Sequence, residues 1–249
     1  MNAERQDTWV YGVVPAGTSL KEVERRGEDL PDVSVVEAGD LGAIVGKAPE
    51  DDEKGTRNQA LAHARVLEAA VLDAPVVPFR FGIIVPADDE VEEGLLTEHH
   101  DELAQHLKNV EDRLQMTLKV YYHEDAVLRE IIEKEPEIAE LREKMGEESE
   151  EASRDVRVRL GELISNAVEQ RRQRDTADIA ERLDAVSLAT AAQDLEEEFM
   201  VLNVAFLVER ERQREFEEAV EEVADERQER MRFRLLGPMP PYNFIAAEG

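Results

Sequence analysis

Residues 199–236 read FMVLNVAFLVERERQREFEEAVEEVADERQERMRFRLL and predict a strand, a helix and a second strand. The first ten residues are apolar at nearly every position, which is typical of a strand in the centre of a sheet. Further along, Phe216, Val220 and Val223 recur at helical spacing and predict the buried face of an amphipathic helix. The final MRFRLL alternates apolar and basic residues, as a strand with one buried face does.

The residues before this stretch predict elements of the same kinds. MTLKVYYH, residues 116–123, predicts a strand, and residues 124–184 predict a largely helical region. AVSLATA, residues 185–191, predicts a short strand. From residue 115 the order is therefore βαββαβ, the ferredoxin-like arrangement. Its first crossover has about 60 residues where about a dozen suffice, so we expect the excess to form a projecting helical hairpin.

The first half of the chain predicts a separate set of strands and helices. The segments 8–14, 33–36 and 41–45 are rich in β-branched and apolar residues and predict strands. Two helices are expected, one capped by Thr56 and one opening at Asp88 and Asp89. The apolar stripe of the first is Leu61, Ala64, Leu67 and Val71; that of the second runs from Val91 to Leu114.

The predicted fold class is α+β with two domains. The N-terminal α+β domain is expected at 1–114 and the C-terminal domain, a modified ferredoxin-like βαββαβ fold, at 115–236. The second domain carries the helical insertion at about 124–184, and a tail rich in proline and aromatic residues follows at 237–249.

The charge balance excludes several classes of partner. The chain has 249 residues, with 59 Asp and Glu against 30 Lys and Arg, and a net charge of −29. Phosphate backbones and anionic lipids attract clusters of Lys and Arg, so the sequence predicts binding to neither nucleic acid nor a lipid membrane. It has no apolar run of about 18 residues and no secretion leader, which predicts a cytoplasmic protein.

Signatures of catalysis and of cofactor binding do not occur in the sequence. The absence of cysteine excludes thiol nucleophiles, disulfides and Cys-ligated metals. The dinucleotide-binding GxGxxG, the P-loop, HExxH and GxSxG are also missing. We therefore predict a protein that is not an enzyme, with no catalytic residue, no metal site and no cofactor.

The histidines allow one metal hypothesis, which we disfavour. His99, Glu102 and His106 are spaced i, i+3 and i+7, so they share a helix face that could hold a divalent ion. The solvated flank of a leucine stripe explains this trio more simply. We interpret His63, in the middle of the first helix, as a packing or hydrogen-bonding residue and not as a general base.

Two apolar segments are poorly explained by ordinary packing. PVVPFRFG, residues 75–82, is expected to be extended, with Phe79 and Phe81 on one side and Arg80 on the other. GPMPPYNF, residues 237–244, follows the last strand and is stiffened by prolines, which lack the N–H donors that a sheet interior needs. The candidate partner-binding residues are Pro78, Phe79, Arg80, Phe81, Gly82, Gly237, Pro238, Pro240, Pro241, Tyr242 and Phe244.

The sequence leaves two interpretations of these segments open. Each is either a strap that closes its own domain, or a recognition surface that proline orders in advance, which lowers the entropy lost on binding. A proline-rich ligand for a WW or SH3 domain is disfavoured, because the tail has PPY without the PPxY spacing and without a flanking cation.

These segments resemble the GvpF/GvpL family of gas vesicle proteins. The resemblance rests on WVYGVV, HARVLEAAV, PVVPFRFG, LNVAFLV and LGPMPPYNF, which occur in the family's order over almost the whole chain. The sequence has Met239 where the family often has tryptophan, and Asn243 where serine is common. These departures leave open whether the chain is a GvpF or a GvpL.

The resemblance implies a two-domain α+β protein whose C-terminal domain is a modified ferredoxin-like fold. It also implies an accessory or minor structural protein that binds the hydrophobic shell protein GvpA, limits its aggregation and helps to nucleate the vesicle. Other accessory gas vesicle proteins are further implied partners, and the gas-facing side of the shell is the implied location besides the cytoplasm. The alternatives are a ligand- or metal-responsive regulatory module and a structural homo-oligomer.

Overall fold

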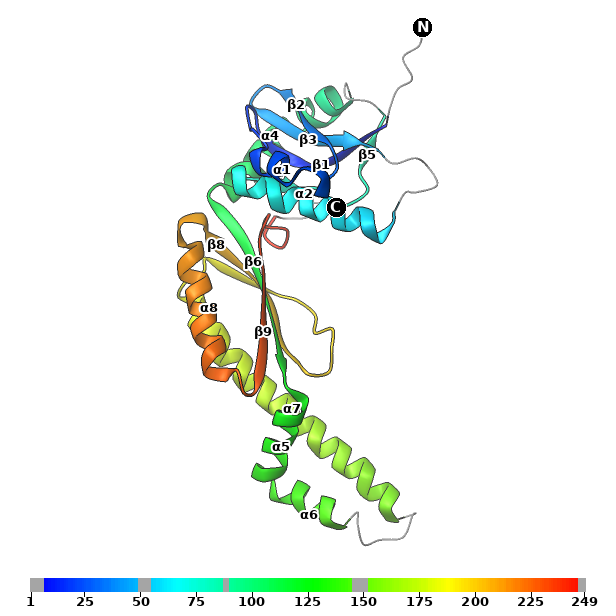
Figure 1. Cartoon of the computed structure of the whole chain (residues 1–249), viewed down its shortest axis with the longest axis vertical. Helices are drawn as coiled ribbons and strands as arrows, with labels where there is room; N and C mark the ends of the chain where they lie inside the picture. Colours follow the sequence, from blue (N-terminus) through cyan, green and yellow to red (C-terminus); the bar gives the residue numbers. More distant parts are fainter. Residues whose placement is uncertain (1–6, 49–54, 87–89, 145–151, 246–249) are drawn as a thin grey trace. The chain divides into compact units, whose positions relative to one another are not determined.

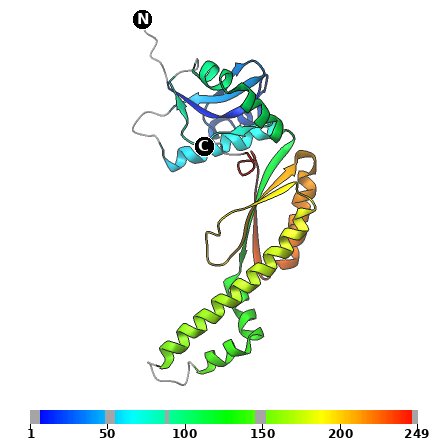
Figure 2. The same ribbon diagram turned by 180° about the vertical axis from the view of Figure 1, so that it is seen from behind.

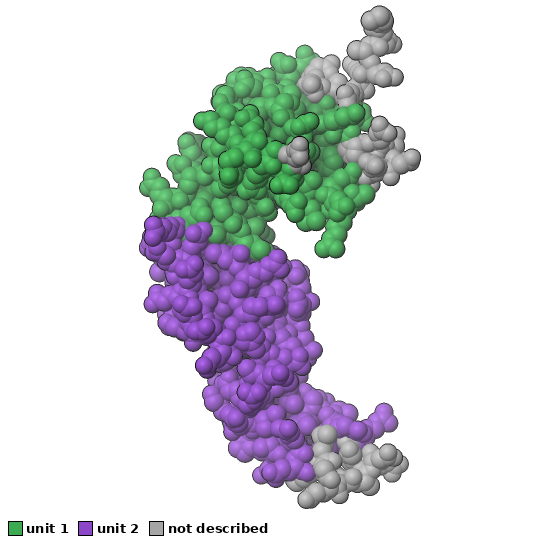
Figure 3. Space-filling model, viewed as in Figure 1, with its two compact units in different colours: residues 1–116, 207–213, 236–249 green, residues 117–206, 214–235 purple. Residues whose placement is uncertain are grey.

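The computed structural model describes residues 7–48, 55–86, 90–144 and 152–245. The chain forms two compact units, which Figure 3 colours separately. Residues 1–116, 207–213 and 236–249 make the first unit, and residues 117–206 and 214–235 make the second. The C-terminal segment therefore belongs to the same unit as the N-terminal strands.

The first unit is built on an antiparallel sheet ordered β2-β3-β1-β4, with β5 also paired to β1. Its strands are β1 (Thr8–Pro15), β2 (Val33–Ala38), β3 (Leu41–Lys47), β4 (Val77–Pro78) and β5 (Ile84–Val85). The register of β1 against β3 shifts between Val10 and Gly12. This bulge makes Tyr11 an extra residue in β1, and Tyr11 packs in the same cluster as Trp9.

Helices cover both faces of this sheet (Figure 1). The helical elements are α1 (Lys21–Arg26), a 3₁₀ turn (Gly27–Asp29), α2 (Arg57–Asp73), a π-helix η3 (Val91–Thr97) and α4 (His100–Val110). Buried residues of α2, such as Val66 and Leu67, pack with Trp9 on one face. Leu103 and Leu107 of α4 pack with Val10 on the other. The first unit is thus a sheet between two helical layers.

The start of α2 agrees with the sequence, but its buried face does not. Thr56 and Gln59 form the reciprocal hydrogen bonds of a capping box. Leu61, predicted to be buried, is 47% exposed, whereas His63 is 4% exposed. The buried stripe includes Ala69 and Ala70, whose small side chains let the helix approach the sheet closely. The positions of the large apolar residues therefore did not predict the buried face of α2.

The predicted second helix is wrong as one continuous element. Its expected start at Asp88 and Asp89 lies outside the described residues. The rest divides into η3 and α4, and Leu114 lies in the strand β6 (Arg113–Tyr122) instead of at the end of the helix. Asp112 has a positive φ of 54°, a backbone conformation that Asp tolerates and that ends a helix within one residue.

The second sheet has the order β7-β8-β6-β9. Its other strands are β7 (Ala189–Ala192), β8 (Met200–Glu209) and β9 (Met231–Met239). Between β6 and β7 lie α5 (Glu124–Lys134), α6 (Pro136–Lys144) and α7 (Ala152–Asp184); between β8 and β9 lie a 3₁₀ turn (Arg210–Arg212) and α8 (Gln213–Arg227). The predicted order of strands and helices is present, but β9 runs to Met239, so the tail does not begin at residue 237. An edge strand tolerates Pro238 because one side of its backbone needs no partner.

The helices α7 and α8 lie against the same side of this sheet (Figure 2). The ring of Phe206 in β8 lies 5.1 Å from that of Phe216 in α8. The Tyr122 hydroxyl in β6 donates to Asp175 of α7 at 2.5 Å. These apolar and polar contacts fix both helices to the strands.

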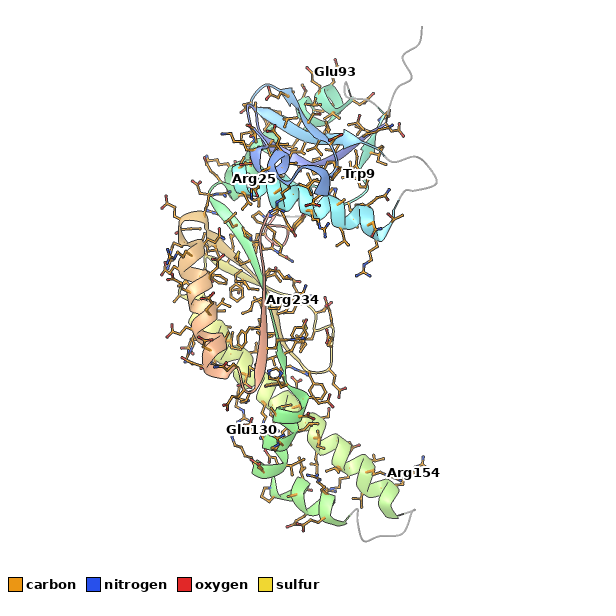
Figure 4. The ribbon with its side chains drawn as sticks, in the orientation of Figure 1. Trp9, Arg25, Glu93, Glu130, Arg154 and Arg234 are labelled. Atoms are coloured by element: carbon orange, nitrogen blue, oxygen red, sulfur yellow. The ribbon has the colours of Figure 1, made fainter. Side chains whose placement is uncertain are left out.

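A polar cluster holds the helical insertion to the sheet. Arg230, just before β9, pairs with Glu130 of α5 and Asp175 of α7, each at 3.0 Å. Arg171 of α7 is 7% exposed and lies 3.9 Å from Glu130, which Figure 4 labels. Removing one member of such a cluster leaves a buried charge uncompensated, so the cluster favours a single position for α5 against α7.

Candidate partner-binding site

The segment 75–82 contains the short strand β4, which lies at the end of the strand order of the first sheet. Pro78 pairs with Gly12 of β1, and the Phe79 amide donates to the Tyr11 carbonyl at 2.9 Å. The prediction that Phe79 and Phe81 share one side is wrong. Phe79 packs against the α4-side cluster, whereas the Phe81 ring lies 5.2 Å from Trp9, on the α2 side.

A turn at Gly82 explains this divergence. Extended chain ends at Pro78, and Gly82 has a φ of 95°, a conformation that glycine adopts without steric cost. The alternation of sides that holds along a strand therefore stops before Phe81. The turn leaves Phe81 36% exposed and Ile83 37% exposed, with Arg80 also in solvent.

Phe81 covers an aromatic cluster of Trp9, Tyr11 and His63. The Tyr11 and His63 rings are stacked with centroids 5.0 Å apart, and Phe81 meets His63 edge-on at 5.8 Å. The Trp9 ring, labelled in Figure 4, stacks on Tyr11 at 5.8 Å. Aromatic pairs in such geometries contribute stability beyond that of the area they bury, so the partly exposed Phe81 ring packs on a rigid aromatic cluster.

His63 is a buried packing residue, in agreement with its interpretation from the sequence. Its Nε2 lies 3.2 Å from the Phe79 carbonyl oxygen; a carbonyl only accepts, so Nε2 carries the proton and donates. Burial lowers the pKa of His63, and the bond to Phe79 only partly opposes this. Burial also raises the pKa of Tyr11 to about 12. Both rings are therefore neutral near pH 7.

The C-terminal segment is fastened to its own unit by Gln115. This β6 side chain is 2% exposed. Its Nε2 donates to Oδ1 of Asn243 at 2.9 Å, and its Oε1 accepts from the Asn243 backbone amide at 3.0 Å. Gly237 allows the close approach: a Cβ there would lie 2.8 Å from the Gln115 carbonyl oxygen, and its φ is 125°. We call this pair of residues, Gln115 and Asn243, the amide clamp.

The other predicted residues of the tail divide into inward and outward groups. Pro240 and Pro241 are buried, Pro238 and Phe244 are half-buried, and Ile245 packs against the α4-side cluster. Tyr242 is 40% exposed. Burial of its hydroxyl raises the pKa of Tyr242, and the nearby charge of Glu68 on α2 raises it further. The tail is thus a strap over its own unit that leaves the Tyr242 side chain partly exposed.

The histidine trio does not form a metal site. His99 and Glu102 approach to only 3.9 Å, and both side chains are about half exposed. Within residues 7–48, 55–86, 90–144 and 152–245, no three His, Asp or Glu side chains are grouped to hold a metal ion. His100, which the sequence did not single out, hydrogen-bonds Asp40 at 2.6 Å.

No helix in the described part of the chain is both long and apolar enough to cross a membrane.

This arrangement of two sheets and their helices is the fold of gas vesicle protein F. The crystal structure of GvpF from Anabaena sp. PCC7120 matches with a TM-score of 0.79 and 21% identity, over 98% of this chain and 100% of that one. The structure of GvpF from Microcystis aeruginosa matches with a TM-score of 0.72 and 21% identity, over 96% of this chain and 99% of that one.

Sequence comparison supports the same assignment. Gas vesicle protein F of Streptomyces sp. strain CB03234 is 31% identical over 240 residues, covering 96% of this chain and 99% of the relative. That of Dolichospermum flosaquae is 24% identical over 238 residues, covering 95% and 96%. The family described as gas vesicle synthesis protein GvpL/GvpF matches residues 7–246. The chain belongs to this family.

Proposed function

We propose that this chain is a non-enzymatic accessory protein of gas vesicle assembly that binds the shell protein GvpA, limits its aggregation and helps to nucleate the vesicle. Membership of the GvpL/GvpF family supports a function in gas vesicles. The observation that carries the binding proposal is the exposure of Phe81, Ile83 and Tyr242 at 36–40% on a chain of net charge −29.

Net charge and exposed apolar side chains have separate effects in this proposal. A hydrophobic shell subunit exposes apolar surface before it polymerises, so a soluble binder must cover that surface without aggregating itself. Exposed apolar groups supply contact, and a large net charge keeps copies of the binder apart. The bound state on this account lies at the growing vesicle, on the gas-facing side of the shell.

The candidate residues have different roles in this proposal. Phe81 and Tyr242, joined by Ile83, contact the partner. Phe79, Phe244, Pro240 and Pro241 anchor their segments to the chain's own cores. The conformation of the two segments is set by Pro78, Gly82, Gly237 and Pro238. Arg80 is exposed next to Phe81. Rigid anchoring reduces the entropy lost when the exposed rings bind.

The domain division is also a proposal. The sequence places the boundary between the two domains at 114/115; we propose to move it to about 116, so that Gln115 belongs to the N-terminal domain. We join the segment 237–249 to that domain because the amide clamp ties Asn243 to Gln115, and we assign the C-terminal domain to about 117–236. The strand order β7-β8-β6-β9 supports a ferredoxin-like assignment for the C-terminal domain. So does the position of the helices, which follow β6 and β8 along the chain.

A pull-down with GvpA tests the binding proposal. The variant combines F81S, I83S and Y242S; the control combines L61S and L72S, which change side chains that are 47% and 40% exposed on α2. We expect the first variant to lose capture and to let GvpA aggregate, while the control behaves as the unmodified chain. Equal capture by both variants contradicts the proposal. Circular dichroism separates lost binding from unfolding. Unfolding of the first variant would favour the alternative in which the two segments only close their own domain.

A further inference from the structure

The two edges of the second sheet differ in their protection. β9 presents Arg232 and Arg234 and contains Pro238, and charges and prolines are devices that keep an edge strand from pairing with another chain. β7 reads ATAA, and residues 186–193 around it carry no charge in a chain that is 36% charged. Its shortness is one of the features that limit pairing with another chain.

The backbone of β7 directs hydrogen-bonding groups away from the sheet. The Gln193 amide donates to the Asn203 carbonyl of β8 at 2.8 Å. Alternation along an antiparallel strand then directs the N–H and C=O groups of Thr190 and Ala192 to the open side. Because β7 ends the strand order of this sheet, no strand of the described chain pairs with that side, and both residues are exposed.

A hollow for side chains adjoins this edge. It has a volume of about 380 Å³ and lies between α7 and β8. Its lining includes Ala177, Ala192, Leu195, Val201 and Leu202. Leu188 and Leu195, at the two ends of β7, are 47% and 43% exposed. Backbone pairing and apolar pockets together are the features of β-strand addition.

The charges around the hollow select the partner. Five acidic side chains lie at or beside the hollow: Glu169 of α7, and Asp194, Glu196, Glu197 and Glu198 in the loop after β7. Their summed charge is −5, and the two cations paired with them, Arg172 and Lys119, reduce it to −3. Arg172 pairs with Glu169 at 2.5 Å, and Lys119 pairs with Glu196 at 3.0 Å. A second copy of this chain carries the same acidic loop and a net charge of −29, so copies repel each other here.

We propose that the free edge of β7 and the adjoining hollow bind an extended apolar segment of another protein, flanked by basic residues, which adds to the sheet as a further strand. This site is separate from the exposed rings of the first unit and does not depend on the proposed capture of GvpA. The partner's backbone pairs with Thr190 and Ala192, and its apolar side chains enter the hollow beside Leu195.

The direct test uses a fluorescent peptide, KKVTVTV, titrated with the full chain. We expect saturable binding that weakens with salt, and weaker binding of EEVTVTV. Two N-methylated isomers, methylated at alternate amides, block one edge of the peptide or the other. Losing two hydrogen bonds of about 1 kcal/mol each predicts a loss of affinity of at least about tenfold for one isomer only.

Measurements on the protein side keep the test decisive. A192P removes one outward amide and lowers affinity about fivefold, whereas L72S, on the first unit, leaves it unchanged. If A192P does not fold, hydrogen exchange of the unmodified chain decides: the peptide slows exchange of the Thr190 and Ala192 amides. Equal binding of both N-methylated isomers, protection elsewhere, or no binding overturns the proposal. So does a dimer in light scattering that the peptide dissociates, because the occupant is then a second copy.

Discussion

The amide clamp gives a quantitative prediction for the order of the C-terminal segment. Q115A removes both hydrogen bonds to Asn243, at 2.9 and 3.0 Å. A typical intramolecular hydrogen bond contributes about 1 kcal/mol net, so the pair contributes about 2 kcal/mol. The truncation also leaves a cavity at a site that is 2% exposed, which adds about 1 kcal/mol. We expect Q115A to lower the free energy of unfolding of the first unit by about 3 kcal/mol.

Hydrogen exchange and thermal unfolding measure this effect. The amides of Met239 and of residues 242–245 should exchange faster in Q115A while those of α2 stay protected, because the strap detaches before the core opens. In a domain of this size a loss of about 3 kcal/mol lowers the midpoint of unfolding by about 6–12 °C. Denaturation of the first unit must be followed with a probe of its own, such as the fluorescence of Trp9, since two units need not unfold together.

Gln105 offers a matched control on the same unit. Its Nε2 donates to Asn109 Oδ1 at 2.9 Å, an amide pair of the same length that lies in solvent. We expect Q105A to change stability by less than about 0.5 kcal/mol, as exposed substitutions do. If Q115A also unfolds at an unchanged temperature with an unchanged rate of exchange in the tail, the clamp does not hold the strap and the reasoning fails.

Two further predictions concern positions in the same unit. G237A forces a Cβ to 2.8 Å from the Gln115 carbonyl oxygen at a φ of 125°; we expect a loss of about 2 kcal/mol or more, read from urea denaturation, and a loss no greater than that of G161A, where a Cβ meets nothing, would contradict it. His63 has a folded-state pKa below its ordinary value of 6.5, so below pH 6.5 the unfolded chain binds a proton that the folded chain refuses. Stability therefore falls as the pH drops from 6.5 towards the lowered pKa, by up to about 1.4 kcal/mol per pH unit. In H63F this part of the slope disappears, and parallel stability curves for the two proteins would refute the assignment.

Local patterns in the sequence predicted most elements because their causes are local. The capping residues Thr56 and Gln59 are three positions apart, and the apolar run of β8 is continuous. Both signals depend only on neighbours in the chain. The order of strands from residue 115 followed from these elements, and the strand order β7-β8-β6-β9 now accompanies it.

The errors lie where one residue interrupts a local pattern or where the pattern is too short to be detected. Phe79 and Phe81 lie on different sides because a turn at Gly82 interrupts the extended chain. The alternation of side chains along a strand does not predict the φ of a single glycine. α1 was not predicted, because six residues with one buried side chain, Val23, carry too short a pattern.

The candidate site was predicted by composition and not by contacts. Proline and aromatic residues singled out both segments, but they did not show which rings face inward. The amide clamp joins residues 128 positions apart, and a glutamine in a strand gives no sign of such a partner. That Tyr242 is exposed beside the half-buried Phe244 could not be predicted from the spacing of the two rings.

Photocrosslinking from single positions tests the central claim most directly. Benzoylphenylalanine is placed at position 81, 242 or 79 in separate variants, each is mixed with GvpA under light, and the adducts are identified by mass. The account predicts adducts with GvpA from the exposed positions 81 and 242, and none from position 79, whose side chain packs inward. Adducts of equal yield from all three positions, or none from 81 and 242 in a folded chain that still captures GvpA, would contradict it.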